Sequence, residues 1–169
     1  MTETARGKAW VFGDDVNTDY IISSKRKRDT LDPKILSQYL MEDIRPGFGP
    51  LVEKGDFLVG GRNFGCGSAM EIATTVIIGS GIRAVIARSF SRTFFRNSIN
   101  GGLLLVEADT ERINEGDLLS VVIERDALIV RNHTRGEEYQ GEIIPDFLNS
   151  IVQSGGLISY LKENRDFPE

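Results

Sequence analysis

The stretch of the chain best suited to chemistry is a glycine-rich segment, residues 61–71, with the sequence GRNFGCGSAME. Its three glycines allow the backbone to turn sharply and to approach a ligand closely. The segment ends with Ser68 and, three residues later, Glu71, a spacing typical of a helix start. The backbone N–H groups of such a start and the Ser68 hydroxyl converge on one point. The segment therefore predicts a place that holds a carboxylate or stabilises an oxyanion.

Two interpretations of Ser68 are open from the spacing alone. In the first, Ser68 and Glu71 form a capping box and have no chemical role. In the second, Ser68 is a nucleophile or a general base, which requires a lowered hydroxyl pKa. One unit of pKa depression needs about 1.4 kcal/mol, and a helix N-terminus supplies roughly 0.3–2 kcal/mol. A reactive Ser68 would therefore need arginines or a metal nearby, because the only histidine, His133, is remote in sequence.

Length and composition exclude several classes of function. A chain of 169 residues with 40% hydrophobic and 27% charged residues is typical of one globular domain with a sizeable core. A formal net charge of -5 gives no general attraction to nucleic acid or anionic membranes. No apolar run approaches the ~20 residues of a membrane span. Because the single cysteine, Cys66, cannot alone build a zinc or iron–sulfur site, any metal centre must come from another chain. We expect a cytoplasmic protein that binds neither nucleic acid nor membrane.

The elements that must position the glycine-rich segment alternate between strands and helices. Strands are expected at residues 8–12, 56–60, 82–87 and 103–106, and helices at residues 33–41, 68–78 and 91–100. After the first strand we expect a polar turn, a short strand at residues 20–22 and a loop over residues 23–30. The alternating order predicts right-handed crossovers onto a partly parallel sheet.

The pattern changes near residue 117. Strands at residues 118–123, 127–130 and 137–143, separated by turns, predict an antiparallel meander. A C-terminal helix is expected from Pro145, with an interruption at the glycine pair 155–156. Both parts are expected to share one domain, residues 1–169, with stacked β, β and α layers.

Four motifs, in this order and at these separations, give the chain a family resemblance. They are residues 14–19 (DDVNTD), 63–68 (NFGCGS), 81–87 (GIRAVIA) and 89–100 (SFSRTFFRNSIN). Together they resemble the small subunits of the aconitase superfamily, in particular those of 3-isopropylmalate dehydratase (isopropylmalate isomerase) and homoaconitase. The resemblance covers nearly the whole chain. It implies an α/β fold, namely a swivelling β/β/α domain like the aconitase C-terminal domain, with a mixed sheet plus a small antiparallel sheet.

The same resemblance implies a hydro-lyase subunit that is active only with a partner. The partner is a large subunit whose own cysteines carry a [4Fe-4S] cluster, and the open iron of that cluster acts as a Lewis acid on the substrate. The family reaction removes water from a small hydroxy di- or tricarboxylic acid and adds it back. By motif match Ser68 is the base, and Asp19 is a second catalytic residue unless it merely caps a turn. Thr18 and Gly67 are expected beside the substrate, where loop amides stabilise charge.

The chain departs from the family pattern directly after the serine. The family continues Gly-Ser-Ser-Arg-Glu-His-Ala, whereas Gly67 and Ser68 are followed by Ala69 and Met70. The missing arginine normally helps to bind a substrate carboxylate, and a buried carboxylate that loses its cation costs about 3–5 kcal/mol. Three explanations are open: another arginine replaces it, the substrate presents an apolar group to Ala69 and Met70, or the activity is lost. We favour an altered substrate, of the dimethylmalate or citramalate type.

A run of four cations, residues 25–28, is the second unusual feature. In the resembled family this region is a mobile loop that helps to select the substrate. Four cations suit an anionic substituent, as in homoaconitate, better than an isopropyl group. Arg26 and Arg28 are the candidate substrate ligands, because a guanidinium can grip a carboxylate bidentately and could supply the charge that Met70 lacks. A solvated loop is the alternative.

Two functions of other classes stay open beside the enzyme hypothesis. The chain could be a non-catalytic regulatory or assembly subunit with the same fold, or a stand-alone anion-binding protein. Arg92 and Arg96 lie four residues apart on one expected helix face, where we expect structural or interface roles.

Overall fold

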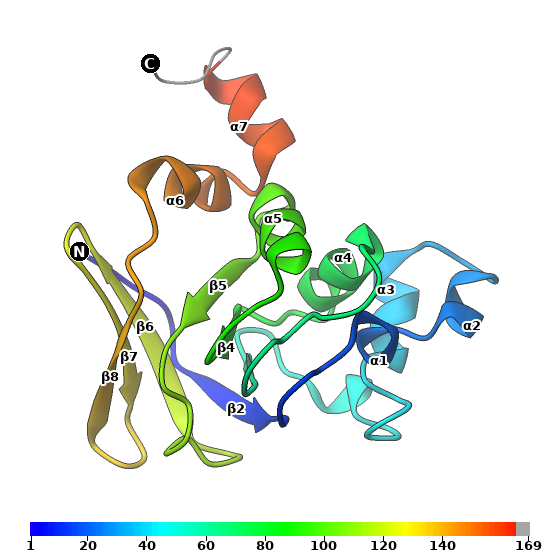
Figure 1. Ribbon diagram of the computed structural model, residues 1–169, viewed down its shortest axis with the longest axis horizontal. Coiled ribbons are helices and arrows are strands. Elements are labelled where there is room, and N and C mark those ends of the chain that lie inside the picture. The colour runs from blue at the N-terminus through cyan, green and yellow to red at the C-terminus, as the bar shows by residue number, and fades with distance from the viewer. Residues whose placement is uncertain (165–169) are drawn as a thin grey trace.

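A computed structural model describes residues 1–164, in which one mixed sheet carries helices along its length (Figure 1). The strands lie in the order β5-β4-β3-β2-β6-β7-β8, and β1 pairs with β6. Their bounds are β1 Thr2–Glu3, β2 Gly7–Val11, β3 Phe57–Val59, β4 Ala84–Ala87, β5 Leu104–Glu107, β6 Leu118–Glu124, β7 Ala127–Asn132 and β8 Glu137–Gly141. The expected mixed α/β fold is confirmed.

Strand β2 joins the two halves of the sheet. One edge of β2 pairs in parallel with β3, and the parallel arrangement continues through β4 to β5. Its other edge pairs antiparallel with β6, where Gly7 lies opposite Leu119, and the antiparallel arrangement continues through β7 to β8. The parallel and antiparallel parts expected from the sequence are therefore continuous.

The parallel strands are buried on both faces, as is typical of strands covered on each side. All four residues of β4 are buried. Val85 and Ala87 point into one apolar cluster, which also contains residues of α1, α3 and α4. Ala84 and Ile86 point into the other cluster, shared with β6, β7, α6 and α7. The sheet therefore supports two cores, and the first of them lies beneath the glycine-rich segment.

The helices at residues 33–36, 71–79, 92–101, 146–153 and 157–164 follow the expected order, whereas those at residues 18–21 and 24–27 were not expected. The helix bounds are α1 Thr18–Ile21, α2 Ser24–Lys27, α3 Pro33–Leu36, α4 Glu71–Gly79, α5 Arg92–Gly101, α6 Asp146–Gln153 and α7 Leu157–Asn164, with 3-10 turns at Ser37–Tyr39 and Gly49–Leu51. Ser91 caps α5 by accepting a hydrogen bond from Phe94 N (3.3 Å), and Gly102 ends the helix at φ 86°. Within residues 1–164, no helix has both the length and the apolar character that crossing a membrane requires.

Two local expectations are wrong, each because of a helix cap. The expected strand at 20–22 is largely α1, because the Asn17 side chain accepts from Asp19 N at 2.9 Å. The expected loop at 23–30 contains α2, because Ser23 Oγ accepts from Lys25 N at 3.3 Å. The capping box at Ser68 does not form.

Helix α4 begins only at Glu71, later than the sequence predicts. The N-cap position belongs to Met70, whose side chain makes no capping hydrogen bond. Ser68 therefore lies in the loop before the helix, so the capping interpretation no longer accounts for it.

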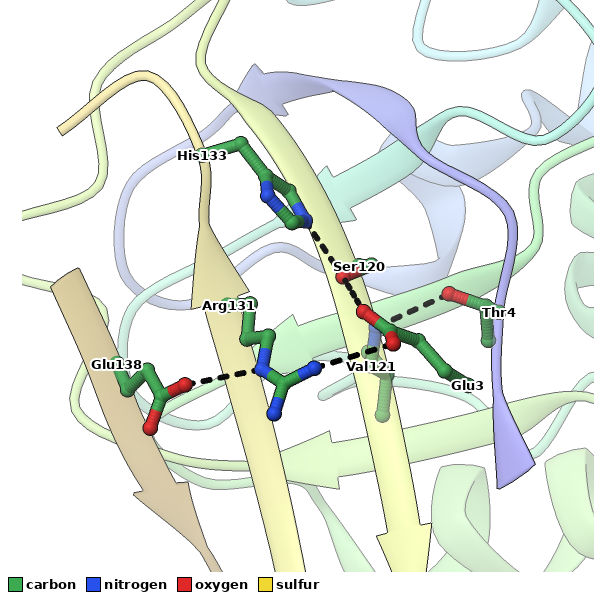
Figure 2. Close-up of polar contacts among 7 residues, drawn as sticks. All are labelled: Glu3, Thr4, Ser120, Val121, Arg131, His133 and Glu138. Carbon is green, nitrogen blue, oxygen red and sulfur yellow. Dashed lines mark hydrogen bonds and ion pairs between the residues drawn. The ribbon is translucent and has the colours of Figure 1, made fainter. Parts of the chain in front are cut away.

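Figure 2 shows how β1 is fixed to the antiparallel part of the sheet. Ser120 Oγ donates to Glu3 Oε1 (2.8 Å) and lies 2.8 Å from His133 Nε2. Arg131 donates to Glu3 Oε2 (3.1 Å) and to Glu138 Oε1 (2.9 Å). Chiefly through the Ser120 hydrogen bond, this network lowers the pKa of Glu3. Because Ser120 is fully buried, its hydroxyl has no access to a substrate, and its contact with His133 has a structural role.

Candidate functional site

The glycine-rich loop, residues 61–70, is attached along one side to the segment that contains residues 14–19. Hydrogen bonds run from Asp15 N to Arg62 O (2.8 Å), from Gly65 N to Val16 O (2.8 Å) and from Thr18 N to Cys66 O (2.8 Å). Two of the four sequence motifs are therefore joined backbone to backbone. The loop and the start of α1 form one unit.

The other side of the loop is attached to the segment that leads into α5. Asn63 N donates to Ser89 Oγ (2.8 Å), and Ser91 N donates to Phe64 O (3.0 Å). The Ser91 hydroxyl also donates to Gly65 O at 2.8 Å. A third motif thus holds the same loop, so the loop is fixed from two directions.

Two glycines of the loop have conformations that other residues adopt at a cost. Gly65 has φ +81°, and a Cβ there would run into the Phe94 ring. Gly67 has φ +95°, and a Cβ there would run into the side-chain amide of Asn17. A left-handed conformation costs an L-residue roughly 1–2 kcal/mol. The glycines therefore permit the tight approach of the loop to its two neighbours.

Ser68 projects from this fixed loop with a free hydroxyl. The residue is exposed, and its backbone carbonyl accepts a hydrogen bond from Thr18 Oγ1 at 2.9 Å. Thr18 itself is only 2% exposed. Within residues 1–164, the Ser68 hydroxyl makes no hydrogen bond. The structure thus gives Thr18 a role in positioning Ser68, and it leaves the serine oxygen available to another molecule.

The amide groups around Ser68 are also free. In the part of the chain that the structure describes, the N–H groups of Gly67, Ser68 and Ala69 donate no hydrogen bond. All three residues are exposed. Unpaired N–H groups grouped in this way can hold a carboxylate or an oxyanion, which is the chemistry that the sequence predicts for this segment.

Cys66 lies within the loop, and Asp19 directly follows Thr18, whose N–H donates to Cys66 O. Asp19 is exposed in the first turn of α1, where Asn17 rather than Asp19 acts as the cap. Cys66 is half-buried, and burial, followed by the charge of Asp15, raises the pKa of its thiol. The cysteine is therefore a neutral thiol, whereas Asp19 presents its carboxylate to solvent.

Arg26, one of the two expected substrate ligands, is already engaged within the chain. It donates to both carboxylate oxygens of Glu42 (2.7 and 3.0 Å). Its guanidinium also lies 3.8 Å from the centroid of the Tyr39 ring. Arg28, the other expected ligand, is exposed and has no ion-pair partner among the described residues. Arg26 therefore anchors α2, whereas Arg28 remains free.

Lys27 is the cation that the structure brings to the loop, and sequence reasoning missed it. Its Nζ lies 2.6 Å from Met70 Sδ. The sequence signal for Lys27 would have been its position next to Arg26 on a helix, because successive side chains on a helix point about 100° apart. A helix whose Arg26 is held on one side necessarily directs Lys27 elsewhere.

The remaining candidate residues are spread over the surface. Arg62, Arg92 and Arg96 are exposed, and none has an ion pair within the described chain. Among residues 1–164, no group of three His, Cys, Asp or Glu side chains is gathered closely enough to hold a metal ion. The chemistry of the site therefore centres on Ser68, the free amides and nearby charged groups.

Comparisons with known proteins agree with this arrangement. Residues 52–111 match the Aconitase C-terminal domain family. The chain is 45% identical over 161 residues to 3-isopropylmalate dehydratase small subunit 1 of Archaeoglobus fulgidus, covering 95% of this chain and 98% of that one. It is 42% identical over 165 residues to the isopropylmalate/citramalate isomerase small subunit of Methanocaldococcus jannaschii, with 96% of each covered.

A solved structure shows the same fold. The crystal structure of a 3-isopropylmalate dehydratase from Methanocaldococcus jannaschii superimposes with a TM-score of 0.90 at 38% identity, covering 97% of this chain and 96% of that one. The resemblance inferred from the four sequence motifs is thereby confirmed. The chain belongs to the family of 3-isopropylmalate dehydratase small subunits, which are hydro-lyase subunits with the aconitase C-terminal domain fold.

Proposed function

We propose that this chain is the small subunit of a hydro-lyase that removes water from a hydroxy di- or tricarboxylic acid and adds it back, with Ser68 as the base. The observation that carries the proposal is the exposed Ser68 hydroxyl on a loop fixed from two sides. Relatives named 3-isopropylmalate dehydratase small subunit support the reaction class. The fixed loop supports a role in which a reacting group must be held in place.

The proposed chemistry assigns a separate task to each part of the loop. Ser68 takes the proton from the carbon next to a substrate carboxylate, and the electron pair of that C–H bond forms a carbon–carbon double bond as hydroxide leaves the neighbouring carbon. The free N–H groups of Gly67 and Ala69 stabilise the negative charge that develops on the carboxylate. Asp19, exposed in the first turn of α1, is assigned the task of orienting the substrate through its charge. Addition of water reverses these steps.

A partner is required because this chain does not activate Ser68 by itself. No cation or base of the described residues bonds to the Ser68 hydroxyl, and each unit of pKa depression needs about 1.4 kcal/mol. A large subunit must therefore supply the missing groups. The lone Cys66 and the lack of a metal-binding group within residues 1–164 do not fit a [4Fe-4S] cluster in this chain. We assign such a cluster to the large subunit.

The test is a Ser68→Ala variant in the heteromer reconstituted with the large subunit. We expect the variant to assemble normally but to lose about 10²- to 10⁴-fold in turnover, as for a general base. Ser150→Ala is the matched control, because Ser150 is an exposed serine on α6 whose hydroxyl bonds only within its own helix. Unchanged turnover in the Ser68 variant would refute its role as base. A wild-type heteromer that dehydrates no hydroxy acid would refute the reaction class.

A methyl-substituted substrate is the second candidate, favoured by Ala69 and Met70 beside the serine. Both side chains are apolar, and Met70 is half-buried at the end of the loop. A relative in Methanocaldococcus jannaschii is named for citramalate as well as isopropylmalate. A panel of isopropylmalate, citramalate, dimethylmalate and homoaconitate will rank the substrates by kcat/KM. If isopropylmalate ranks first, the inference of an altered substrate is wrong.

A further inference from the structure

The glycine-rich loop changes its hydrogen-bonding neighbour at Asn63. The preceding residue, Arg62, accepts a hydrogen bond from Asp15 N (2.8 Å), in the segment that follows β2. Asn63 N instead donates to Ser89 Oγ (2.8 Å), on the other side of the loop. At Gly65 the backbone N–H donates to the first segment again. Asn63 is therefore the residue at which the loop backbone passes from one neighbouring segment to the other.

The side chain of Asn63 keeps the first segment attached at this point. Asn63 Nδ2 donates to Asp15 Oδ1 at 2.9 Å. The Asp15 carboxylate has no ion pair within residues 1–164, so a neutral amide is its side-chain partner there. A hydrogen bond to an ionised acceptor is stronger than one between neutral groups. Through its backbone and its side chain, Asn63 thus joins the motif that contains the proposed base to two other motifs.

Both members of this pair have a backbone conformation that favours glycine. Asp15 has φ 54° and Asn63 has φ 57°, and among the other described non-glycine residues only Met41 has a positive φ. Asn and Asp adopt this conformation more readily than most residues, but glycine adopts it without strain. The same loop has glycine at its other left-handed positions, Gly65 and Gly67. An asparagine at residue 63 therefore indicates that its side chain is needed, since strain of this kind gathers at functional sites.

We infer that Asn63 and Asp15 are positioning residues, which fix the loop so that the Ser68 hydroxyl meets the substrate C–H bond at a constant distance and angle. This inference rests on the proposed function and names the residues that hold its base in place. Neither residue touches the substrate. Displacing a reacting group by about 1 Å can cost about a hundredfold in rate. The pair therefore acts on kcat more than on substrate binding.

An Asn63→Gly variant of the reconstituted heteromer separates positioning from folding. Glycine removes the side-chain hydrogen bond but relieves the left-handed backbone, so the two effects on stability oppose each other. We expect Tm to stay within about 4 °C of the wild type. We expect kcat to fall about tenfold and KM to change less than about threefold. Asp15→Asn is the matched control, because its amide oxygen can still accept from Asn63, and its kcat should stay within about threefold of the wild type.

An Asn63→Asp variant tests the contact itself. It places a second carboxylate against Asp15, and because like charges repel we expect kcat to fall at least about tenfold. Combining Asn63→Asp with Asp15→Asn forms the same donor–acceptor pair in reverse, which should restore kcat to within about threefold of the wild type. Hydrogen exchange gives a readout without turnover. The Gly65 amide should exchange faster in Asn63→Gly, whereas the amides of β6 should keep their wild-type rates.

The outcomes distinguish this inference from the proposed function. Wild-type kcat in both Asn63 variants, in a heteromer whose Ser68→Ala variant is inactive, overturns the positioning role and leaves the proposed function intact. A double variant that is no more active than Asn63→Asp alone also overturns the positioning role, because the restored contact then has no effect. Full activity in Ser68→Ala overturns the proposed function and the positioning role together.

Discussion

Replacing Gly65 with alanine tests whether the glycine-rich loop is held by shape as well as by hydrogen bonds. Gly65 has φ +81°, and a Cβ would run into the Phe94 ring, which is buried. The left-handed conformation costs roughly 1–2 kcal/mol, and forcing extra volume into a packed core costs about 1–3 kcal/mol. We therefore expect Gly65→Ala to lower the free energy of unfolding by about 2–5 kcal/mol.

Gly116→Ala provides the matched control. Gly116 has φ +86°, nearly the same conformation, but a Cβ there would meet nothing within 4 Å. Only the conformational cost of roughly 1–2 kcal/mol should remain. At about 2–4 °C per kcal/mol for a chain of this size, Tm should fall roughly 4–20 °C for the Gly65 variant and about 2–8 °C for the control. Equal shifts of Tm in the two variants would refute the packing argument.

Three other substitutions test polar contacts that hold the loop or the sheet. Thr18→Val removes the hydroxyl that holds Ser68 O, so we expect about 1 kcal/mol less stability in urea unfolding and a lower kcat in the heteromer. Asp56→Ala removes a buried carboxylate that accepts three hydrogen bonds, so unfolding free energy should fall by about 3 kcal/mol or more. Glu3→Gln removes a carboxylate whose pKa the Ser120 hydrogen bond lowers below 4.5. That carboxylate stabilises the fold above its unfolded pKa and stops doing so as pH falls through its folded pKa.

Each of these outcomes can be contradicted by a simple measurement. A Thr18→Val heteromer with unchanged kcat would show that the Ser68 carbonyl needs no support. Wild-type stability in Asp56→Ala would mean that water replaces the carboxylate. For Glu3→Gln, the difference in urea midpoint from the wild type should be present at neutral pH and shrink in acid below 4.5. A difference that is equal at both pH values would contradict the assigned cause of the pKa shift.

The strands and longer helices were predictable because their signals are local. Residues 84–87 form a short apolar run, which is typical of a strand buried on both faces. Asp32 followed by Pro33 marks a helix start, and the structure shows the Asp32 side chain accepting from Lys34 N at 2.9 Å. Nothing beyond adjacent residues was needed for these elements.

The details of the site depend on contacts between distant residues, which the sequence does not reveal. Ser68 and Glu71 have the spacing of a capping box. The hydroxyl of Thr18, fifty positions earlier, donates a hydrogen bond to the Ser68 carbonyl and helps to keep Ser68 outside the helix. The Arg26 guanidinium could bind a substrate carboxylate, but it already donates two hydrogen bonds to the carboxylate of Glu42. The position of the glycine-rich loop was predictable from its residue types and their spacing. Which cation of residues 25–28 lies beside Met70 was not, because that depends on the contact between Arg26 and Glu42.

The position of β2 has a consequence for how the chain is made. One edge of this strand pairs with β6, in which Leu119 lies opposite Gly7. Leu119 is synthesised about 110 residues after Gly7, so this pairing cannot form until then. At ribosomal rates of about 5–20 residues per second, that edge stays open for roughly 5–20 s. Its unpaired backbone is a template on which another nascent chain can add a strand. The yield of folded subunit during expression is therefore expected to depend on how quickly the C-terminal half follows, and to improve at lower chain concentration.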